Sequence, residues 1–137
     1  VFSTDWFKLY EIKNNFTNGE NFYGLKPPDY VTAVALDEDN MLTLIQQFRP
    51  VINKLSLETP GGQVDTGKTP EQVIENELIE ELGCKFEKIQ KIITLEPDVG
   101  RLMNKLHIFK AERPKKIHII VTICSIFFLR ITTWFLI

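Results

Sequence analysis

Residues 62–84 read GQVDTGKTPEQVIENELIEELGC, and the fold of the chain is inferred outward from this stretch. It contains both ends of a predicted helix. Thr69 suits the N-cap, and Gln72 completes a Thr-x-x-Gln capping box with it. Pro70 suits the first helical position, and Gly83 suits the left-handed C-cap. The stretch therefore predicts one helix that begins just after Thr69 and ends just before Gly83.

The predicted helix carries an apolar stripe beside an acidic one. Ile74, Leu78 and Leu82 recur every fourth residue, which is the spacing of a helix face that packs against a core. No Lys or Arg lies between Lys68 and Lys85. Like charges three or four residues apart cost about 0.2–0.5 kcal/mol per pair, so this helix repels itself. The acidic residues are Glu71, Glu75, Glu77, Glu80 and Glu81.

Three of these glutamates share one arc near the end of the helix. Glu77, Glu80 and Glu81 stand at positions i, i+3 and i+4, where the helix macrodipole already disfavours anions. A bound cation would compensate this charge, and carboxylate oxygens suit Mg²⁺ or Mn²⁺ better than zinc. The alternative interpretation is a solvated acidic face.

A glycine-rich turn precedes the helix. Pro60, Gly61 and Gly62 predict a tight turn, in which backbone carbonyls can reach a metal and backbone amides can reach a phosphate. The turn and the acidic helix together are therefore compatible with binding of a metal or of a phosphate.

The segment from Gly62 to Cys84 resembles the Nudix box, G-x5-E-x7-R-E-U-x-E-E-x-G-U, where U is a bulky apolar residue. Cys84 is a small substitute for the final apolar residue, and two positions depart from the pattern. Lys68 replaces a glutamate, and Asn76 replaces an arginine. The positions that match outright are Gly62, Glu77, Leu78, Glu80, Glu81 and Gly83.

Residues 5–112 resemble the ADP-ribose pyrophosphatase branch of that family. Pro28-Asp29-Tyr30 is followed by VTAVALDEDNMLTLIQQFRP and then by the LETPGG turn that ends at Gly62. In this branch the arginine of the Q-[FY]-R-P segment and the glutamate before the turn contact substrate. The resemblance therefore assigns substrate binding to Arg49 and Glu58. Taken alone, Arg49 could equally be a solvated arginine at the end of a strand.

The resemblance also implies a mechanism: hydrolysis of a nucleoside diphosphate linked to another moiety, ADP-ribose or another nucleoside diphosphate sugar. Divalent metal, Mg²⁺ or Mn²⁺, would be held by the carbonyl of Gly61 and by the catalytic carboxylates Glu77, Glu80 and Glu81. One of these carboxylates could act as the base. The loop at residues 96–101 could supply the base instead, although turn formation explains its residues equally well.

The two departures from the box bear on activity. In the family the missing glutamate and arginine pair with each other and help to hold the catalytic helix, so losing both costs less than stranding one. We therefore expect an active enzyme with a reduced rate. The alternative is a Nudix-shaped nucleotide-binding or regulatory module. Lys68 could restore some orientation by pairing with Glu71 or Glu75.

The expected fold is α/β (α+β), with a mixed sheet sandwiched between helices. Apolar alternation and β-branched residues predict strands at Trp6–Ile12, Tyr30–Leu36, Leu42–Phe48, Lys88–Leu95 and Lys105–Lys110. The chain of 137 residues is long enough for one such domain, which we assign to residues 1–112.

Composition bears on partners and location. A net charge of −2 gives no reason to expect nucleic-acid binding. Cys84 and Cys124 show no metal or redox spacing, and residues 1–5 do not resemble a secretory signal, so a cytoplasmic location is expected. The resemblance implies a homodimer whose N-terminal strands cross between subunits. Trp6, Phe7 and Tyr10 could supply its apolar surface.

Residues 113–137 form an apolar C-terminal tail that departs from the family pattern. A further strand and an amphipathic helix are expected there, yet residues 117–137 show no helical polar face. Three interpretations stay open: final strands of the sheet, an aberrant terminus that replaces the closing helix, and a membrane anchor. The length and the basic flank fit an anchor. Arg130 counts against it, since a central arginine costs about 2.5–3.5 kcal/mol.

Overall fold

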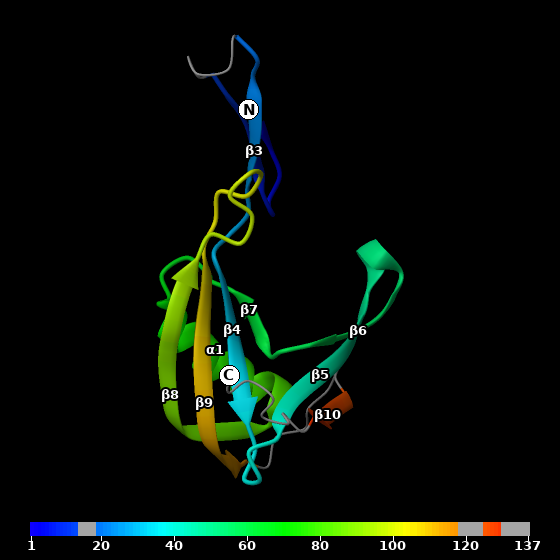
Figure 1. Ribbon diagram of the computed structural model, residues 1–137, viewed down its shortest axis with the longest axis vertical. Coiled ribbons are helices and arrows are strands. Elements are labelled where there is room, and N and C mark those ends of the chain that lie inside the picture. The colour runs from blue at the N-terminus through cyan, green and yellow to red at the C-terminus, as the bar shows by residue number, and fades with distance from the viewer. Residues whose placement is uncertain (14–18, 118–124, 130–137) are drawn as a thin grey trace, which may run out of the picture.

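The computed structural model describes residues 1–13, 19–117 and, as backbone, 125–129. This part of the chain contains two β-sheets, one antiparallel and one mixed, and one α-helix. The smaller sheet is N-terminal and antiparallel, and it projects from one end of the molecule (Figure 1). Its strands, in order, are β1 (Phe2–Ser3), β2 (Lys8–Ile12) and β3 (Phe22–Lys26).

The larger sheet has seven strands. β4 and β9 pair in parallel, while β9 with β8, β4 with β5, and β5 with β10 pair antiparallel. The five strands along its main path, in order, are β10 (Ser125–Leu129), β5 (Leu42–Arg49), β4 (Tyr30–Leu36), β9 (Leu106–Lys116) and β8 (Cys84–Leu95).

The larger sheet forks between β4 and β5. These strands pair at Ala35–Leu36 with Leu42–Thr43, and β5 then pairs with β6 (Lys54–Glu58) while β4 pairs with β7 (Gly61–Gln63). The 3-10 helix η1 (Pro50–Ile52) joins β5 to β6. Figure 1 shows the β5–β6 hairpin leaving the body of the sheet, and we call this divergence the fork.

The link between β6 and β7 is fastened to β4 within the fork. The Thr32 and Thr59 hydroxyl oxygens lie 2.6 Å apart, and the Ala33 N–H donates to the Pro60 carbonyl at 2.9 Å. These bonds fix the start of β7, and with it the turn that leads to the helix.

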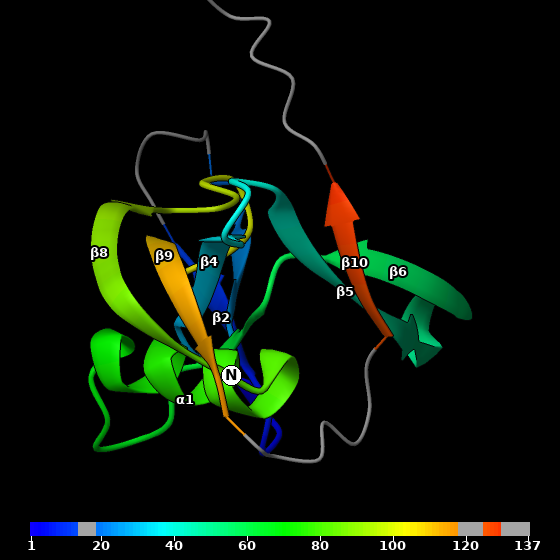
Figure 2. The same cartoon turned by 90° about the horizontal axis from the view of Figure 1, so that it is seen from below.

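The helix α1 (Pro70–Leu82) confirms the predicted boundaries and caps. The Thr69 side chain accepts from the Gln72 N–H, the reciprocal bond of the capping box is present, and Gly83 has φ 64°. Figure 2 shows α1 lying across one face of the sheet formed by β4, β9 and β8. Its buried side chains, the predicted stripe together with Val73, pack on Val31, Ala33, Ala35, Ile45, Phe109 and Ala111.

The mixed sheet and the capped helix confirm the predicted fold class, with differences in detail. The second helical layer that the resemblance implies has no counterpart among the described residues. β8 and β9 extend beyond the predicted strands at their outer ends, Cys84–Glu87 and Ala111–Lys116. Most residues of the second segment are charged, which leaves little apolar alternation there. β3, β6 and β7 were not predicted: β3 and β7 contain glycine, and β6 is a short strand that is largely exposed.

Part of the C-terminal tail is described. Ser125–Leu129 forms β10 along β5. Residues 118–124 and 130–137 lie outside the described part of the chain, so the three interpretations of the tail stay predictions. Among the described residues, no helix has the length and apolar character needed to cross a membrane.

Candidate functional site

The acidic side of α1 faces the backbone of β7. The Gly61 N–H donates a hydrogen bond of 2.9 Å to Glu81 Oε2. Gly62 lies against the carboxylate of Glu77, so closely that an added Cβ would stand 2.1 Å from Glu77 Oε1. The fold therefore brings the glycine turn together with two of the three predicted glutamates. The Glu77 carboxylate has room only because residue 62 is a glycine without a side chain.

Burial raises the pKa of both carboxylates. The pKa of Glu81 is raised to about 7, first by burial and then by the Glu77 charge, against the lowering effect of the Gly61 N–H. The pKa of Glu77 is raised by burial first and then by the charges of Glu80 and Asp65. Glu80 itself is exposed. Two half-buried anions side by side indicate a place where positive charge is favoured.

The donor set around β7 and α1 fits a hard divalent cation in its chemistry. It consists of carboxylate and peptide oxygens, which are the ligands of Mg²⁺ and Mn²⁺ in proteins. Among the described residues, no three His, Cys, Asp or Glu side chains converge as a ready ligand group. The roles of Gly61, Glu77, Glu80 and Glu81 as metal ligands therefore remain a prediction.

The fork carries a second charged group, the ion pair of Arg49 and Glu58. Arg49 Nε donates to Glu58 Oε1 at 2.8 Å, and Arg49 Nη2 donates to Glu58 Oε2. This bond lowers the pKa of Glu58 and raises that of Arg49. The charges of both residues act on Glu81. The two predicted substrate contacts thus lie together, across the fork from the acidic helix.

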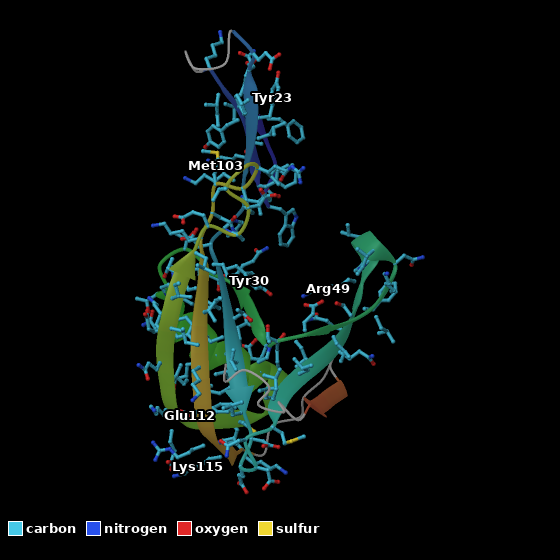
Figure 3. The ribbon with its side chains drawn as sticks, in the orientation of Figure 1. Tyr23, Tyr30, Arg49, Met103, Glu112 and Lys115 are labelled. Carbon is cyan, nitrogen blue, oxygen red and sulfur yellow. The ribbon has the colours of Figure 1, made fainter. Side chains whose placement is uncertain are left out.

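Tyr30 belongs to the same group of side chains, and sequence reasoning assigned it no role. It begins β4, where it pairs with Gln63 of β7 on one side and with Leu106 of β9 on the other. Figure 3 shows it at the end of β4, across the fork from Arg49. Its place at the start of a predicted strand, after Pro28-Asp29, was visible in the sequence, but a strand-initiating tyrosine has no distinctive pattern.

The prediction that Lys68 pairs with Glu71 or Glu75 is wrong. Lys68 Nζ lies 2.9 Å from Asp65 Oδ2, because the Asp65-Thr66-Gly67 turn folds the two side chains together. Glu71 instead pairs with Lys91 of β8 at 2.6 Å, which ties the start of α1 to the sheet. The helix therefore has an anchor that the sequence pattern did not reveal.

The loop at residues 96–101, considered above as a source of the general base, has a structural role. The Asp98 side chain accepts from the Gly100 N–H at 3.1 Å, and its carbonyl accepts from the N–H groups of Arg101 and Leu102. The loop also holds β3, since the Leu25 N–H donates to the Arg101 carbonyl and the Met103 N–H donates to the Leu25 carbonyl. Turn formation thus accounts for Asp98.

A cavity of about 570 Å³ lies between the N-terminal sheet and the segment that joins β7 to α1. Its lining combines aromatic, basic and acidic side chains, including Trp6, Tyr10, Lys26, Gln63 and Asp65. Because the Asp65 charge acts on Glu77, the cavity borders the acidic site.

Comparisons with known proteins agree with this geometry. The family model described as NUDIX domain matches residues 26–128. The ADP-ribose pyrophosphatase of Bacillus subtilis (strain 168) is 30% identical over 88 residues, which cover 64% of this chain and 48% of that protein. The methanol dehydrogenase activator of Bacillus methanolicus is 25% identical over 102 residues, covering 74% of this chain and 54% of that protein.

A third relative and one solved structure extend the comparison. The 8-oxo-dGTP diphosphatase of Haemophilus influenzae is 41% identical over 51 residues, covering 37% of this chain and 38% of that protein. The crystal structure of an ADP compounds hydrolase superposes with a TM-score of 0.74 at 19% identity, covering 94% of this chain and 73% of that chain. The chain spans about half, or less, of the length of these curated relatives.

Proposed function

The chain belongs to the NUDIX domain family, and from this membership we propose that it is a metal-dependent pyrophosphohydrolase whose substrate is ADP-ribose or another nucleoside diphosphate sugar. The Bacillus subtilis relative, an ADP-ribose pyrophosphatase, supports this substrate class. The proposal includes a cytoplasmic location. We favour it over a catalytically impaired nucleotide-binding module.

One observation carries the proposal: the carboxylates of Glu77 and Glu81 are half-buried and repel each other, with the guanidinium of Arg49 across the fork. A diphosphate is an anion and cannot approach these carboxylates without a cation between them. Mg²⁺ or Mn²⁺ bound at Gly61, Glu77, Glu80 and Glu81 would neutralise the diphosphate and lower the pKa of a water.

Each residue around this site would then have its own role. The Gly61 N–H orients the Glu81 carboxylate, and Gly62 leaves room for that of Glu77. Arg49, held in place by Glu58, presents a fixed charge to an anionic substrate, because a guanidinium binds phosphate oxygens in a defined geometry. One of the carboxylates of α1 is the candidate general base.

The direct test is an assay with a panel of diphosphates in the presence of Mg²⁺ or Mn²⁺. The panel contains ADP-ribose, other nucleoside diphosphate sugars, a dinucleotide and an oxidised nucleotide. We expect metal-dependent release of AMP from ADP-ribose. If ADP-ribose binds but no member of the panel is cleaved, the binding-module alternative replaces the enzyme.

A double replacement at the two departures from the box separates a loosened enzyme from a binding module. Lys68→Glu combined with Asn76→Arg should raise hydrolysis about tenfold, which corresponds to about 1.4 kcal/mol of transition-state stabilisation. The single Lys68→Glu change should not help, because it removes the partner of Asp65 and adds an anion near Glu77 and Glu80. Steady-state rates of the three proteins check this. A double variant slower than wild type would contradict the assigned role of these positions.

We also propose that the chain forms a homodimer through its N-terminal sheet. Trp6 is 69% exposed and Phe2 is 59% exposed, and Phe2 contacts Phe7 with ring centroids 6.4 Å apart. Tyr10 is half-buried and lines the cavity. An exposed aromatic surface of this kind is common at protein interfaces. Light scattering at tens of micromolar should give the mass of a dimer, and Trp6→Ser should shift it toward the monomer. A wild-type monomer would exclude the dimer.

A further inference from the structure

Tyr30 is an uncharged residue that lies among the charged groups of the fork. Its strand neighbour on one side is β7, and the pairs that follow, Val31 with Gly62 and Thr32 with Gly61, connect it directly to the turn that holds Glu81. The charges of Arg49, Glu58, Glu81 and Glu77 all act on its hydroxyl. Tyr30 is therefore near enough to the Arg49–Glu58 pair and to the acidic helix for the charges of both to act on it, and Figure 3 shows it across the fork from Arg49.

The hydroxyl of Tyr30 remains a hydrogen-bond donor at physiological pH. Burial raises its pKa above the usual value of a tyrosine; Arg49 opposes this rise, and the three glutamates add to it. A neutral donor complements the fixed cation across the fork, because a phosphoryl oxygen that enters the fork can accept from both groups.

We propose that Tyr30 is a substrate-binding residue whose hydroxyl donates a hydrogen bond to the diphosphate, between the Arg49 guanidinium and the glutamates of α1. The inference rests on the proposed function, and it adds a diphosphate contact that the box and the Q-[FY]-R-P segment do not contain. Its backbone is fixed on both sides, by Gln63 and by Leu106, and the Tyr30 N–H donates to the Lys105 carbonyl at 2.8 Å. Such a residue offers its hydroxyl with little loss of freedom on binding.

The test is Tyr30→Phe, which removes one oxygen and keeps the ring. The matched control is Tyr23→Phe, which makes the same change on β3, where Tyr23 is 59% exposed and far from the fork (Figure 3). Both variants and wild type are assayed with the diphosphate that wild type cleaves best. Binding of the uncleavable α,β-methylene analogue of ADP-ribose is measured by calorimetry, and thermal melts report on the fold.

A hydrogen bond made equally in the ground state and in the transition state changes KM and leaves kcat unchanged. For Tyr30→Phe we expect KM and the dissociation constant of the analogue to rise together about tenfold, as for loss of a hydrogen bond to a charged group. We expect kcat to change less than threefold and the melting temperature to stay at the wild-type value. Tyr23→Phe should match wild type throughout.

Each other outcome has a definite meaning. If Tyr30→Phe binds the analogue as wild type does, the proposed contact is absent while the proposed function stands. If the melting temperature falls and affinity falls with it, the hydroxyl is structural and the inference fails. If wild type neither binds nor cleaves any diphosphate, the proposed function fails first, and the inference fails with it.

Discussion

Replacing Glu81 with glutamine should lower diphosphate hydrolysis by more than about a hundredfold, since even the outer partners of metal ligands typically contribute 10- to 100-fold. The glutamine keeps the size of the side chain, and its amide oxygen can still accept from the Gly61 N–H. What it loses is the charge. The same variant should lose the thermal stabilisation that Mg²⁺ or Mn²⁺ gives wild type, which is about 2.7 kcal/mol at a metal concentration 100 times Kd.

The pH dependence of stability gives this prediction an independent control. The pKa of Glu81 is about 7 in the folded protein and is ordinary in the unfolded chain, so the folded state binds more protons between those values. Stability without metal must therefore fall as pH rises through this range and stay low above pH 7. Glu81→Gln removes that loss. Without metal it should melt at or above the wild-type temperature at pH 8, and the difference between the two proteins should shrink toward pH 5.

Metal binding should reverse the trend in wild type. A cation competes with protons for the Glu77 and Glu81 carboxylates, so the stabilisation by Mg²⁺ should grow from pH 5.5 to pH 7.5. Thermal melts of both proteins across this range, with and without millimolar metal, measure all of these effects. An equal metal shift in Glu81→Gln and wild type would show that the cation binds elsewhere. A variant that melts far below wild type at pH 8 would show that Glu81 is mainly structural.

The sequence was most informative where local rules act alone. The capping box at Thr69, the C-cap at Gly83 and the apolar stripe of α1 depend on neighbours a few residues apart, and each was predicted correctly. The same holds for β4, whose alternating residues face the core on one side. Such patterns lie within a continuous stretch of chain, so they can be recognised in a single sequence.

The fork could not be predicted by this reasoning, because it depends on which strands separate. β7 is a short glycine strand with no periodic signal, and it pairs with β4 next to the Thr59–Pro60 link, which is hydrogen-bonded to the same strand. The partners of Lys68 and Glu71 depended in the same way on a turn and on a distant strand. The Arg49–Glu58 pair joins the two arms of a hairpin, and only the family resemblance placed both residues in one site.

Alanine at the two glycines of β7 should lower hydrolysis in both cases but should lower the melting temperature only at Gly61. At Gly61 an added Cβ would stand 2.1 Å from the Val31 carbonyl oxygen and 2.8 Å from Thr32 Cα. These are backbone atoms of β4, which cannot move without breaking the pairing of β4 with β7. Overpacking of this kind costs about 1–3 kcal/mol or more, so Gly61→Ala should lower the melting temperature by about 10 °C. Hydrolysis should fall as well, because the N–H that holds Glu81 is displaced.

At Gly62 the added Cβ would instead meet the far end of a flexible side chain, Glu77 Oε1, at 2.1 Å. That carboxylate can rotate away, so Gly62→Ala should melt within about 2 °C of wild type, as expected where no backbone atom is forced to move. The displaced Glu77 can no longer stand beside Glu81, so hydrolysis should fall at least about tenfold, the lower end of the effect of disturbing a metal site. Gly100→Ala is the matched control, since its Cβ would make an ordinary contact of 3.5 Å with Asp98 Oδ1. Melts and rates of the three variants separate the two roles. Full activity in Gly62→Ala would mean that the position of Glu77 beside β7 has no part in catalysis.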